Sequence, residues 1–136
     1  MKYDAEIIGQ MNLFEKITHT KLKEFFIFKE KLTFMVQPGQ MMKALGKNKV
    51  NLLKLEKMFN KPLRIIEFNE DMIQFIQNLI APLRCSKIEE ENGIVVITGP
   101  DTKTKGLMIG SKAKNLRETE EVVKKYFPEL EEIKVV

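Results

Sequence analysis

The sequence of 136 residues has very few of the side chains on which catalysis, metal binding and disulfide bonding depend. It contains one cysteine, one histidine and no tryptophan. The single Cys85 excludes an internal disulfide, and Cys85 and His19 together are too few to form a zinc site. Nucleophilic catalysis would need these two residues to meet, and no P-loop lysine motif is present. We therefore expect no metal, no cofactor and no enzymatic activity.

Long apolar runs are also missing. No stretch approaches the roughly 20 apolar residues that a membrane-spanning helix requires, and residues 1–6 lack the apolar core of a signal peptide. Neither low-complexity tracts nor a Pro/Ser-rich linker interrupts the chain. These absences predict a globular cytoplasmic protein with no membrane partner.

The chain does contain a repeated glycine-centred segment. Residues 44–52 and 108–116 each have an apolar residue before a glycine and lysines after it, between two stretches of helical pattern. Gly46 and Gly110 lie 64 residues apart (110 − 46), which is near half the chain and indicates one structural unit used twice. We therefore expect two small domains, residues 1–68 and 69–136. A turn of this kind can bring the backbone close to a phosphate chain.

The positive charge is concentrated in the first half. The net charge is +4 and the isoelectric point is near 9.1, which alone is weak evidence for a nucleic-acid partner. Residues 1–68 contain 13 Lys/Arg and 7 Asp/Glu (+6), whereas residues 69–136 contain 10 and 12 (−2). The first repeat is therefore the better candidate for attracting phosphates.

In the first half, hydrophobic periodicity predicts a helix, two strands, two helices and a strand. The first helix spans residues 4–18 and has a core-facing stripe of Ile7, Met11, Phe14 and Ile17, widened by Ile8. Strands at residues 23–29 and 32–36 are joined by a turn at Glu30-Lys31. A short helix ends at Leu45, and the last strand covers residues 63–68. The helix between them has the apolar positions Val50, Leu53, Leu55 and Met58.

The second half predicts the same order. Its expected elements are a helix at 71–80, a strand at about 83–88, a hairpin turn at Asn92-Gly93, a strand at 94–98, two helices around Gly110 and a strand at 132–136. Cys85 falls in the first of these strands, where we expect its thiol to pack as a small hydrophobe. His19 follows the first helix of the chain, where a capping or solvent-facing position is expected.

This α-β-β-α-α-β order, with a glycine loop between its last two helices, resembles the type II KH domain, and two such domains in tandem resemble the archaeal NusA-like transcription factors. The likeness covers nearly the whole chain. The residues that carry it are 11–18 in the opening helix, 38–48 at the first loop, 79–82 where the repeats join, and 105–110 with 114–116 at the second loop. The resemblance implies an α/β (α+β) fold of two tandem type II KH domains, each with helices packed on one face of a three-stranded sheet.

The resemblance also implies an RNA-binding site at each loop. In the family the loop is Gly-x-x-Gly, whose backbone clamps about four unpaired nucleotides while their bases lie over an apolar groove. In this chain the second glycine is replaced by Lys49 in one loop and by Ala113 in the other, which predicts loosened or reshaped clamps. The implied RNA-binding residues are Leu45, Gly46, Lys47, Asn48, Lys49 and Val50 in the first repeat, and Gly110, Ser111, Lys112, Ala113 and Lys114 in the second.

Several of these residues also have purely structural interpretations. The lysines are equally compatible with a solvated helix start, and Leu45 and Ile109 with core packing. Leu63 and Ile65 are candidate groove residues alongside Leu45 and Val50. Asn51 and Asn115 occupy equivalent positions in the repeats and are expected to cap or brace the loops.

Two functions follow from these expectations. The first is a non-enzymatic archaeal factor that binds single-stranded RNA and acts in transcription elongation, termination or antitermination, with RNA polymerase as a further partner. The alternative is a protein-interaction module with degenerate KH loops, which docks on RNA polymerase or a ribonucleoprotein through the acidic second repeat. The acidic runs at residues 89–91 and 118–121 support the alternative, although such runs are usually solvated faces.

Overall fold

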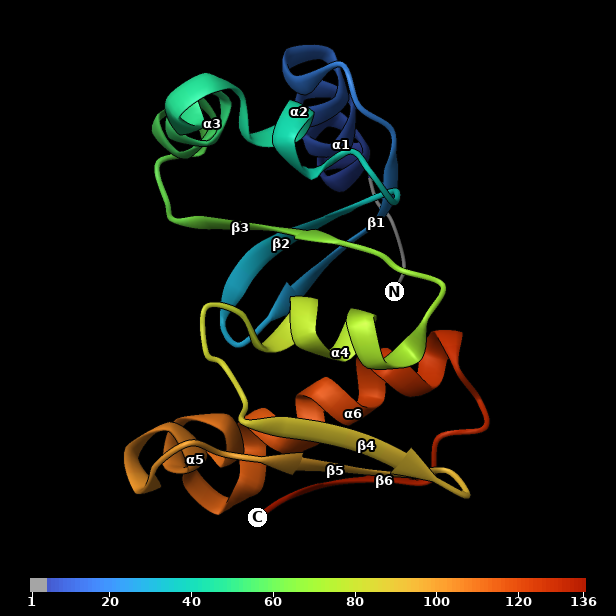
Figure 1. The fold of residues 1–136 in the computed structure, drawn as a ribbon. Coiled ribbons are helices and arrows are strands. Elements are labelled where there is room, and N and C mark those ends of the chain that lie inside the picture. Colours follow the sequence, from blue (N-terminus) through green and yellow to red (C-terminus); the bar gives the residue numbers. More distant parts are fainter. Residues whose placement is uncertain (1–4) are drawn as a thin grey trace. The chain divides into compact units, whose positions relative to one another are not determined.

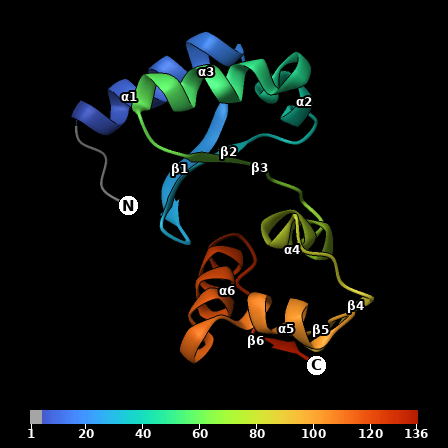
Figure 2. The ribbon, with the colours of Figure 1, turned by 90° about the vertical axis from the view of Figure 1, so that its left-hand side faces the viewer.

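The computed structural model describes residues 5–136 and divides the chain into two compact units, Met1–Asn69 (unit 1) and Glu70–Val136 (unit 2). Each unit has the predicted α-β-β-α-α-β order, and its three helices cover one face of a three-stranded sheet (Figures 1 and 2). The expected fold class of two tandem KH-like domains is confirmed. The predicted first residue of the opening helix, Asp4, lies outside the described residues.

Unit 1 is built around stacked aromatic rings. Its elements are α1 (Ala5–Thr18), β1 (Leu22–Phe28), β2 (Lys31–Val36), α2 (Met41–Leu45), the 3₁₀ turn η1 (Lys47–Lys49), α3 (Val50–Phe59) and β3 (Leu63–Glu67). The ring of Phe34 on β2 stacks on Phe14 of α1 at 4.4 Å and on Phe25 of β1 at 4.5 Å. Ala44 and Leu55 are fully buried in the same cluster, so all three helices share one core with the sheet.

Unit 2 repeats this plan with a different core. Its elements are α4 (Met72–Ile80), β4 (Lys87–Glu91), β5 (Ile94–Thr98), α5 (Thr102–Ile109), the 3₁₀ turn η2 (Ser111–Ala113), α6 (Lys114–Tyr126) and β6 (Glu132–Val135). Phe75 of α4 contacts the rings of Tyr126 and Phe127 at the end of α6. Val95 and Ile97 alternate on the buried face of β5, as the period of two requires.

Both sheets have the same topology. In unit 1, β2 pairs antiparallel with β1 and parallel with β3, and in unit 2, β5 pairs in the same way with β4 and β6. The central strand of each sheet is thus the second strand of its unit. The parallel pairing requires a crossover, which is supplied by the two helices and the glycine loop between them.

Two predicted boundaries are wrong by a few residues. The first hairpin turns at Lys29-Glu30 and not at Glu30-Lys31. Lys29 and Glu30 both have the positive φ that a two-residue hairpin turn requires, and Lys31 already pairs with Phe28 in the sheet. The predicted strand at 83–88 begins only at Lys87. Its partner β5 ends at Thr98, opposite Lys87, so earlier residues have no strand to pair with. Cys85 is therefore a half-buried loop residue and not a strand residue.

Other local expectations can be compared with the side chains. The hairpin turn at Asn92-Gly93 is confirmed, with both residues at positive φ. His19 is exposed, has a positive φ, and donates its amide N–H to the carbonyl of Glu15, which is a helix-capping position. Ile8 was expected in the core stripe of α1 but is exposed.

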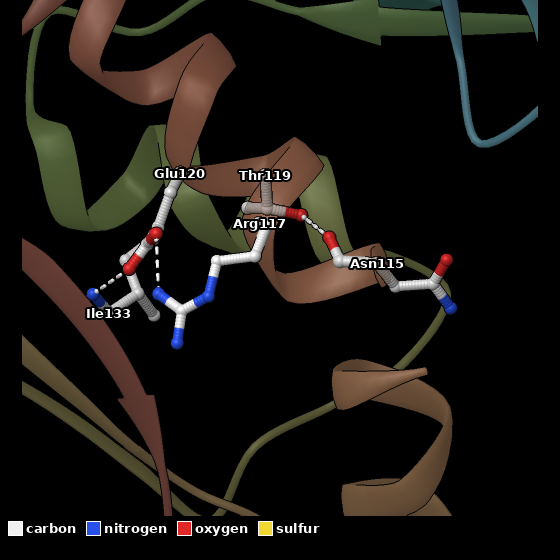
Figure 3. Close-up of polar contacts among 5 residues, drawn as sticks. All are labelled: Asn115, Arg117, Thr119, Glu120 and Ile133. Carbon is white, nitrogen blue, oxygen red and sulfur yellow. Dashed lines mark hydrogen bonds and ion pairs between the residues drawn. The ribbon is translucent and has the colours of Figure 1, made fainter. Parts of the chain in front are cut away.

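A carboxylate, buried in unit 2 and half-buried in unit 1, ties the helix after each glycine loop to the last strand of its unit. In unit 2, Glu120 of α6 accepts the backbone N–H of Ile133 at 2.7 Å and pairs with the Arg117 guanidinium at 2.6 Å (Figure 3). In the same close-up, the Thr119 hydroxyl donates to the carbonyl of Asn115 (3.0 Å). In unit 1, Glu56, which lies 64 residues before Glu120, accepts the N–H of Leu63 at 3.0 Å. The repeat thus extends to this contact.

Among residues 5–136, no helix has the length and apolar character needed to cross a lipid bilayer.

Replacing Glu120 by alanine should lower the free energy of unfolding by about 1–3 kcal/mol, because the buried N–H of Ile133 would lose its acceptor. Urea denaturation followed by circular dichroism measures this change. Glu121→Ala removes the same charge from the next, exposed position and should change stability much less. Equal losses in both variants would contradict the assigned role of Glu120.

Candidate nucleic-acid interface

The first glycine loop joins α2 to α3 through an unusual backbone path. Gly46 has φ 77° and ψ 168°, and Asn48 and Lys49 follow in the left-handed region with φ 54° and 59°. The amide N–H of Gly46 donates to the carbonyl of Met42 and so ends α2, and the N–H of Lys49 donates to the carbonyl of Gly46. The loop therefore ends α2 and leads into α3 within four residues.

The second loop, between α5 and α6, follows the same path. Gly110 has φ 75° and ψ 174°, and Lys112 and Ala113 have φ 54° and 60°. Its hydrogen bonds are equivalent, from Gly110 to the carbonyl of Gly106 and from Ala113 to the carbonyl of Gly110. The two loops agree within a few degrees although only their first residue is the same.

An asparagine braces each loop. The side-chain amide of Asn51 donates to the carbonyl of Lys43 at 3.2 Å, and that of Asn115 donates to the carbonyl of Leu107 at 3.1 Å. Each bond crosses the loop from the later helix to the earlier one, which confirms the expected bracing role of both asparagines. A Cβ atom on Gly46 would lie 2.9 Å from the Asn51 Cγ, and one on Gly110 would lie 2.7 Å from the Asn115 Cγ. Glycine is thus required both by its φ and by the asparagine.

The positions where the family has a second glycine are left-handed as well. Lys49 and Ala113 precede α3 and α6 with positive φ, a conformation that costs an L-residue about 1–2 kcal/mol relative to glycine. Among the described residues, no side chain caps either of these helix starts. The Val50 N–H donates to the carbonyl of Lys47, and the Lys114 N–H donates to that of Ser111. The first turn of each helix still carries the partial positive charge of the helix dipole, which favours an anion nearby.

The first loop exposes its charges. Lys47, Asn48 and Lys49 are all exposed, Gly46 is half-buried between them and the core, and Val50 is exposed at the start of α3. Lys43 on α2 and Lys54 on α3 are exposed on the flanking helices. No acidic residue occurs between Glu30 and Glu56. The loop therefore lies in a segment of purely positive charge.

The second loop is also basic, although the second half of the chain has a net negative charge. Residues 102–117 contain five Lys/Arg and no Asp/Glu, and Lys103, Lys112, Lys114 and Arg117 are exposed. Ser111 is exposed and Ala113 half-buried. The signal was present in the sequence as a local charge window. It was missed because the acidic residues of unit 2 lie mainly in other segments, such as 89–91 and 129–132.

The predicted groove residues are only partly accessible. Leu63 and Ile65 on β3 are buried in the core cluster of unit 1, so their assignment to a groove is wrong. They pair with Leu32 and Phe34 on the central strand and face the helices. Leu45 packs partly on the same core, which leaves Val50 as the exposed member of the predicted set.

A carboxylate fixes the start of the helix before the second loop. Asp101 caps α5 by accepting the N–H of Thr104 at 2.7 Å, and this hydrogen bond holds the pKa of the Asp101 carboxyl below its ordinary value of 3.8. In α6, the hydrogen bond to Glu120 raises the pKa of the Arg117 guanidinium, which is charged at neutral pH in any case.

Three archaeal proteins, each named probable transcription termination protein NusA, are similar to this chain. The Methanococcus vannielii protein is 31% identical over 119 residues, which span 85% of this chain and 69% of the relative. The Methanocaldococcus jannaschii protein is 27% identical over 139 residues, covering 100% of this chain and 75% of the relative. The Thermoplasma acidophilum protein is 25% identical over 127 residues, covering 91% and 88%.

A solved structure shares the fold. The crystal structure of APE1850 matches 98% of this chain and 100% of its own with a TM-score of 0.69. The sequences are 24% identical, so this likeness concerns the fold alone. No protein-family model matches the chain.

Replacing Ala113 by glycine should raise the free energy of unfolding by about 1 kcal/mol, because the left-handed conformation at this position would no longer strain a Cβ atom. Thermal and urea unfolding measure the change. Ser111→Gly provides a matched control in the same loop, since Ser111 does not have a positive φ and should gain nothing. A larger gain for Ser111→Gly would contradict the described loop conformation.

Acid stability offers a test of the Asp101 cap. Folding lowers the pKa of Asp101, so the ionised carboxylate stabilises the folded state. This stabilisation is fully present above about pH 3.8 and is lost as the pH falls through the folded-state pKa. Asp101→Asn keeps an oxygen acceptor at the cap but cannot titrate. Unfolding midpoints measured between neutral and strongly acidic pH should therefore fall less steeply below pH 3.8 in this variant than in the wild type. If the unfolding midpoints of the two proteins fell in parallel, ionisation of Asp101 would make no contribution to stability.

Proposed function

Because the chain belongs to the family of archaeal NusA-like transcription factors, we propose that it binds single-stranded RNA through its two glycine loops and acts in transcription elongation, termination or antitermination. The observation that carries this proposal is the duplicated loop, with the same left-handed backbone in both units and exposed basic side chains at each. The named relatives are described as transcription proteins and not as enzymes.

The proposed contact begins at the first glycine of each loop. Gly46, with its positive φ, turns the backbone so that the exposed residues Lys47, Asn48 and Lys49 can meet a sugar-phosphate chain. No side chain caps the start of α3, and the positive end of its helix dipole favours an anion nearby. Lys47 and Lys49 are exposed on the same loop and add full charges. Each phosphate neutralised in this way releases counterions, which makes the affinity depend on salt.

The second loop offers a different set of donors on the same backbone. The exposed Ser111 supplies a hydroxyl and Lys112 a charge, while Ala113 supplies none. Lys114 and Arg117 add charge from the first turn of α6. We propose that each of the two domains predicted from the sequence, residues 1–68 and 69–136, contributes one clamp, and that RNA polymerase is a partner of the same protein in the archaeal cytoplasm.

Replacing Lys47 and Lys49 together by alanine should weaken binding to single-stranded RNA. Because each lost single-strand phosphate contact lowers the slope of log affinity against log salt by about 0.7, the double variant should lose about 1.4 in slope. Titration of labelled uridine-rich RNA over a salt series measures both quantities, with duplex RNA as a competitor that should bind more weakly.

Lys57→Ala/Lys61→Ala is the matched control. It removes the same charge from exposed positions at the opposite end of α3, roughly 15 Å from the loop. The control should keep most of the wild-type slope. If both double variants lose the same slope, the first loop has no particular role, and if folded wild-type protein binds no RNA at low salt, the proposed function is wrong.

A further inference from the structure

Exposed apolar side chains gather around the first glycine loop. Met42 on α2 is 82% exposed, and Val50 and Leu53 on α3 are 54% and 61% exposed. Val50 and Leu53 are three residues apart and therefore lie on the same face of α3. The Val50 side chain also reaches the loop, because a Cβ on Gly46 would lie 3.0 Å from its Cγ1. This apolar surface thus begins at the loop itself.

The charge around this surface favours a nucleic acid as its occupant. Lys43, Lys47, Lys49 and Lys54 are exposed in the same segment, which contains no acidic residue. Proteins that bind single strands combine cationic side chains for the phosphates with apolar or aromatic surface for the bases. Apolar side chains between lysines therefore match the two chemical parts of an unpaired nucleotide.

The second unit has a different surface at the equivalent positions. Counting 64 residues on, Lys114 stands where Val50 stands and Arg117 where Leu53 stands. Both are exposed on the first turn of α6, directly after the loop. Before the loop, Gly106 replaces Met42, and the exposed Leu107 replaces Lys43. The helix after the second loop thus offers charge where the helix after the first offers apolar contact.

We propose that the two loops divide the recognition of RNA: unit 1 contacts bases through Val50 and Leu53 beside its loop, whereas unit 2 holds the sugar-phosphate chain alone through Lys114 and Arg117. This inference rests on the proposed RNA binding. Contacts to phosphate fix position but carry no sequence information, whereas contacts to bases do. Any preference for particular bases therefore resides in unit 1, and unit 2 adds affinity without preference.

Two probes of the same length separate these contributions: uridine-rich single-stranded RNA, and an abasic strand in which every base is replaced by hydrogen. The full-length wild type should bind the base-bearing strand more tightly. Leu53→Ser should reduce this preference about fivefold, because one half-exposed apolar side chain no longer covers a base. Lys114→Ser, in unit 2, should weaken binding to both probes equally and leave the preference unchanged.

A second variant, Val50→Lys/Leu53→Arg, copies the side chains of unit 2 onto unit 1. It should fold, since equivalent positions of α6 carry these residues, and circular dichroism checks this. The variant should lose the preference for bases while its salt slope rises by about 0.7, because Val50→Lys adds one cation beside the phosphates. Leu53→Arg places a guanidinium three residues before Glu56, where Arg117 stands before its ion-pair partner Glu120, so it adds little to the slope.

The outcomes distinguish this inference from the proposed function. Binding of both probes by wild type without any preference, or a preference that survives in Leu53→Ser and in Val50→Lys/Leu53→Arg, would overturn the division of recognition but leave RNA binding intact. If Lys114→Ser reduced the preference for the base-bearing strand as much as Leu53→Ser does, the division of recognition would also be overturned. Evidence that the apolar surface binds protein and not RNA would overturn it as well. No binding of either probe by wild type would overturn both proposals.

Discussion

The packing of an asparagine against a glycine is the contact on which both loops depend. Asn51 and Asn115 each bridge from the later helix to a carbonyl of the earlier helix, and each occupies the space that a Cβ on Gly46 or Gly110 would fill. The glycine ends the earlier helix, and the asparagine holds the later helix against the earlier one. The two residues with left-handed backbone lie between the glycine and the start of the later helix. The same two helices and loop form the crossover that the parallel strand pair of each sheet requires.

This framework is conserved within the chain while the side chains displayed on it differ. The glycine, the asparagine and the carboxylate that accepts a strand N–H, Glu56 or Glu120, recur at a spacing of 64 residues. Most of the residues between and after them do not recur, although Leu52 and Leu116 do. A backbone that is fixed by these few contacts leaves the exposed positions of the loop and the next helix turn free to vary. Two units of one fold can therefore differ in what they contact.

Much of this could be predicted from local signals in the sequence. The order of elements, the Asn92-Gly93 turn, the strand Ile94–Thr98 and the bracing asparagines each depend on residues close together in the chain. Periodicity was less informative for α3, where six of the ten positions are apolar. Leu52, Leu55 and Phe59 face the core, whereas three of the four predicted apolar positions, Val50, Leu53 and Met58, are exposed. A helix this rich in apolar residues does not reveal its buried face by composition.

The sequence by itself determined the duplication, the fold class and the place of the loops, because turn residues and hydrophobic periods act over a few positions. The tertiary structure alone decided which residues form surface. Leu63 and Ile65 became core when β3 paired with β2, and β4 could begin only where β5 offered a partner. The left-handed conformation of Lys49 and Ala113 was imposed in the same way, by helices packed on either side. Such outcomes depend on contacts between segments distant in the chain, which no local pattern encodes.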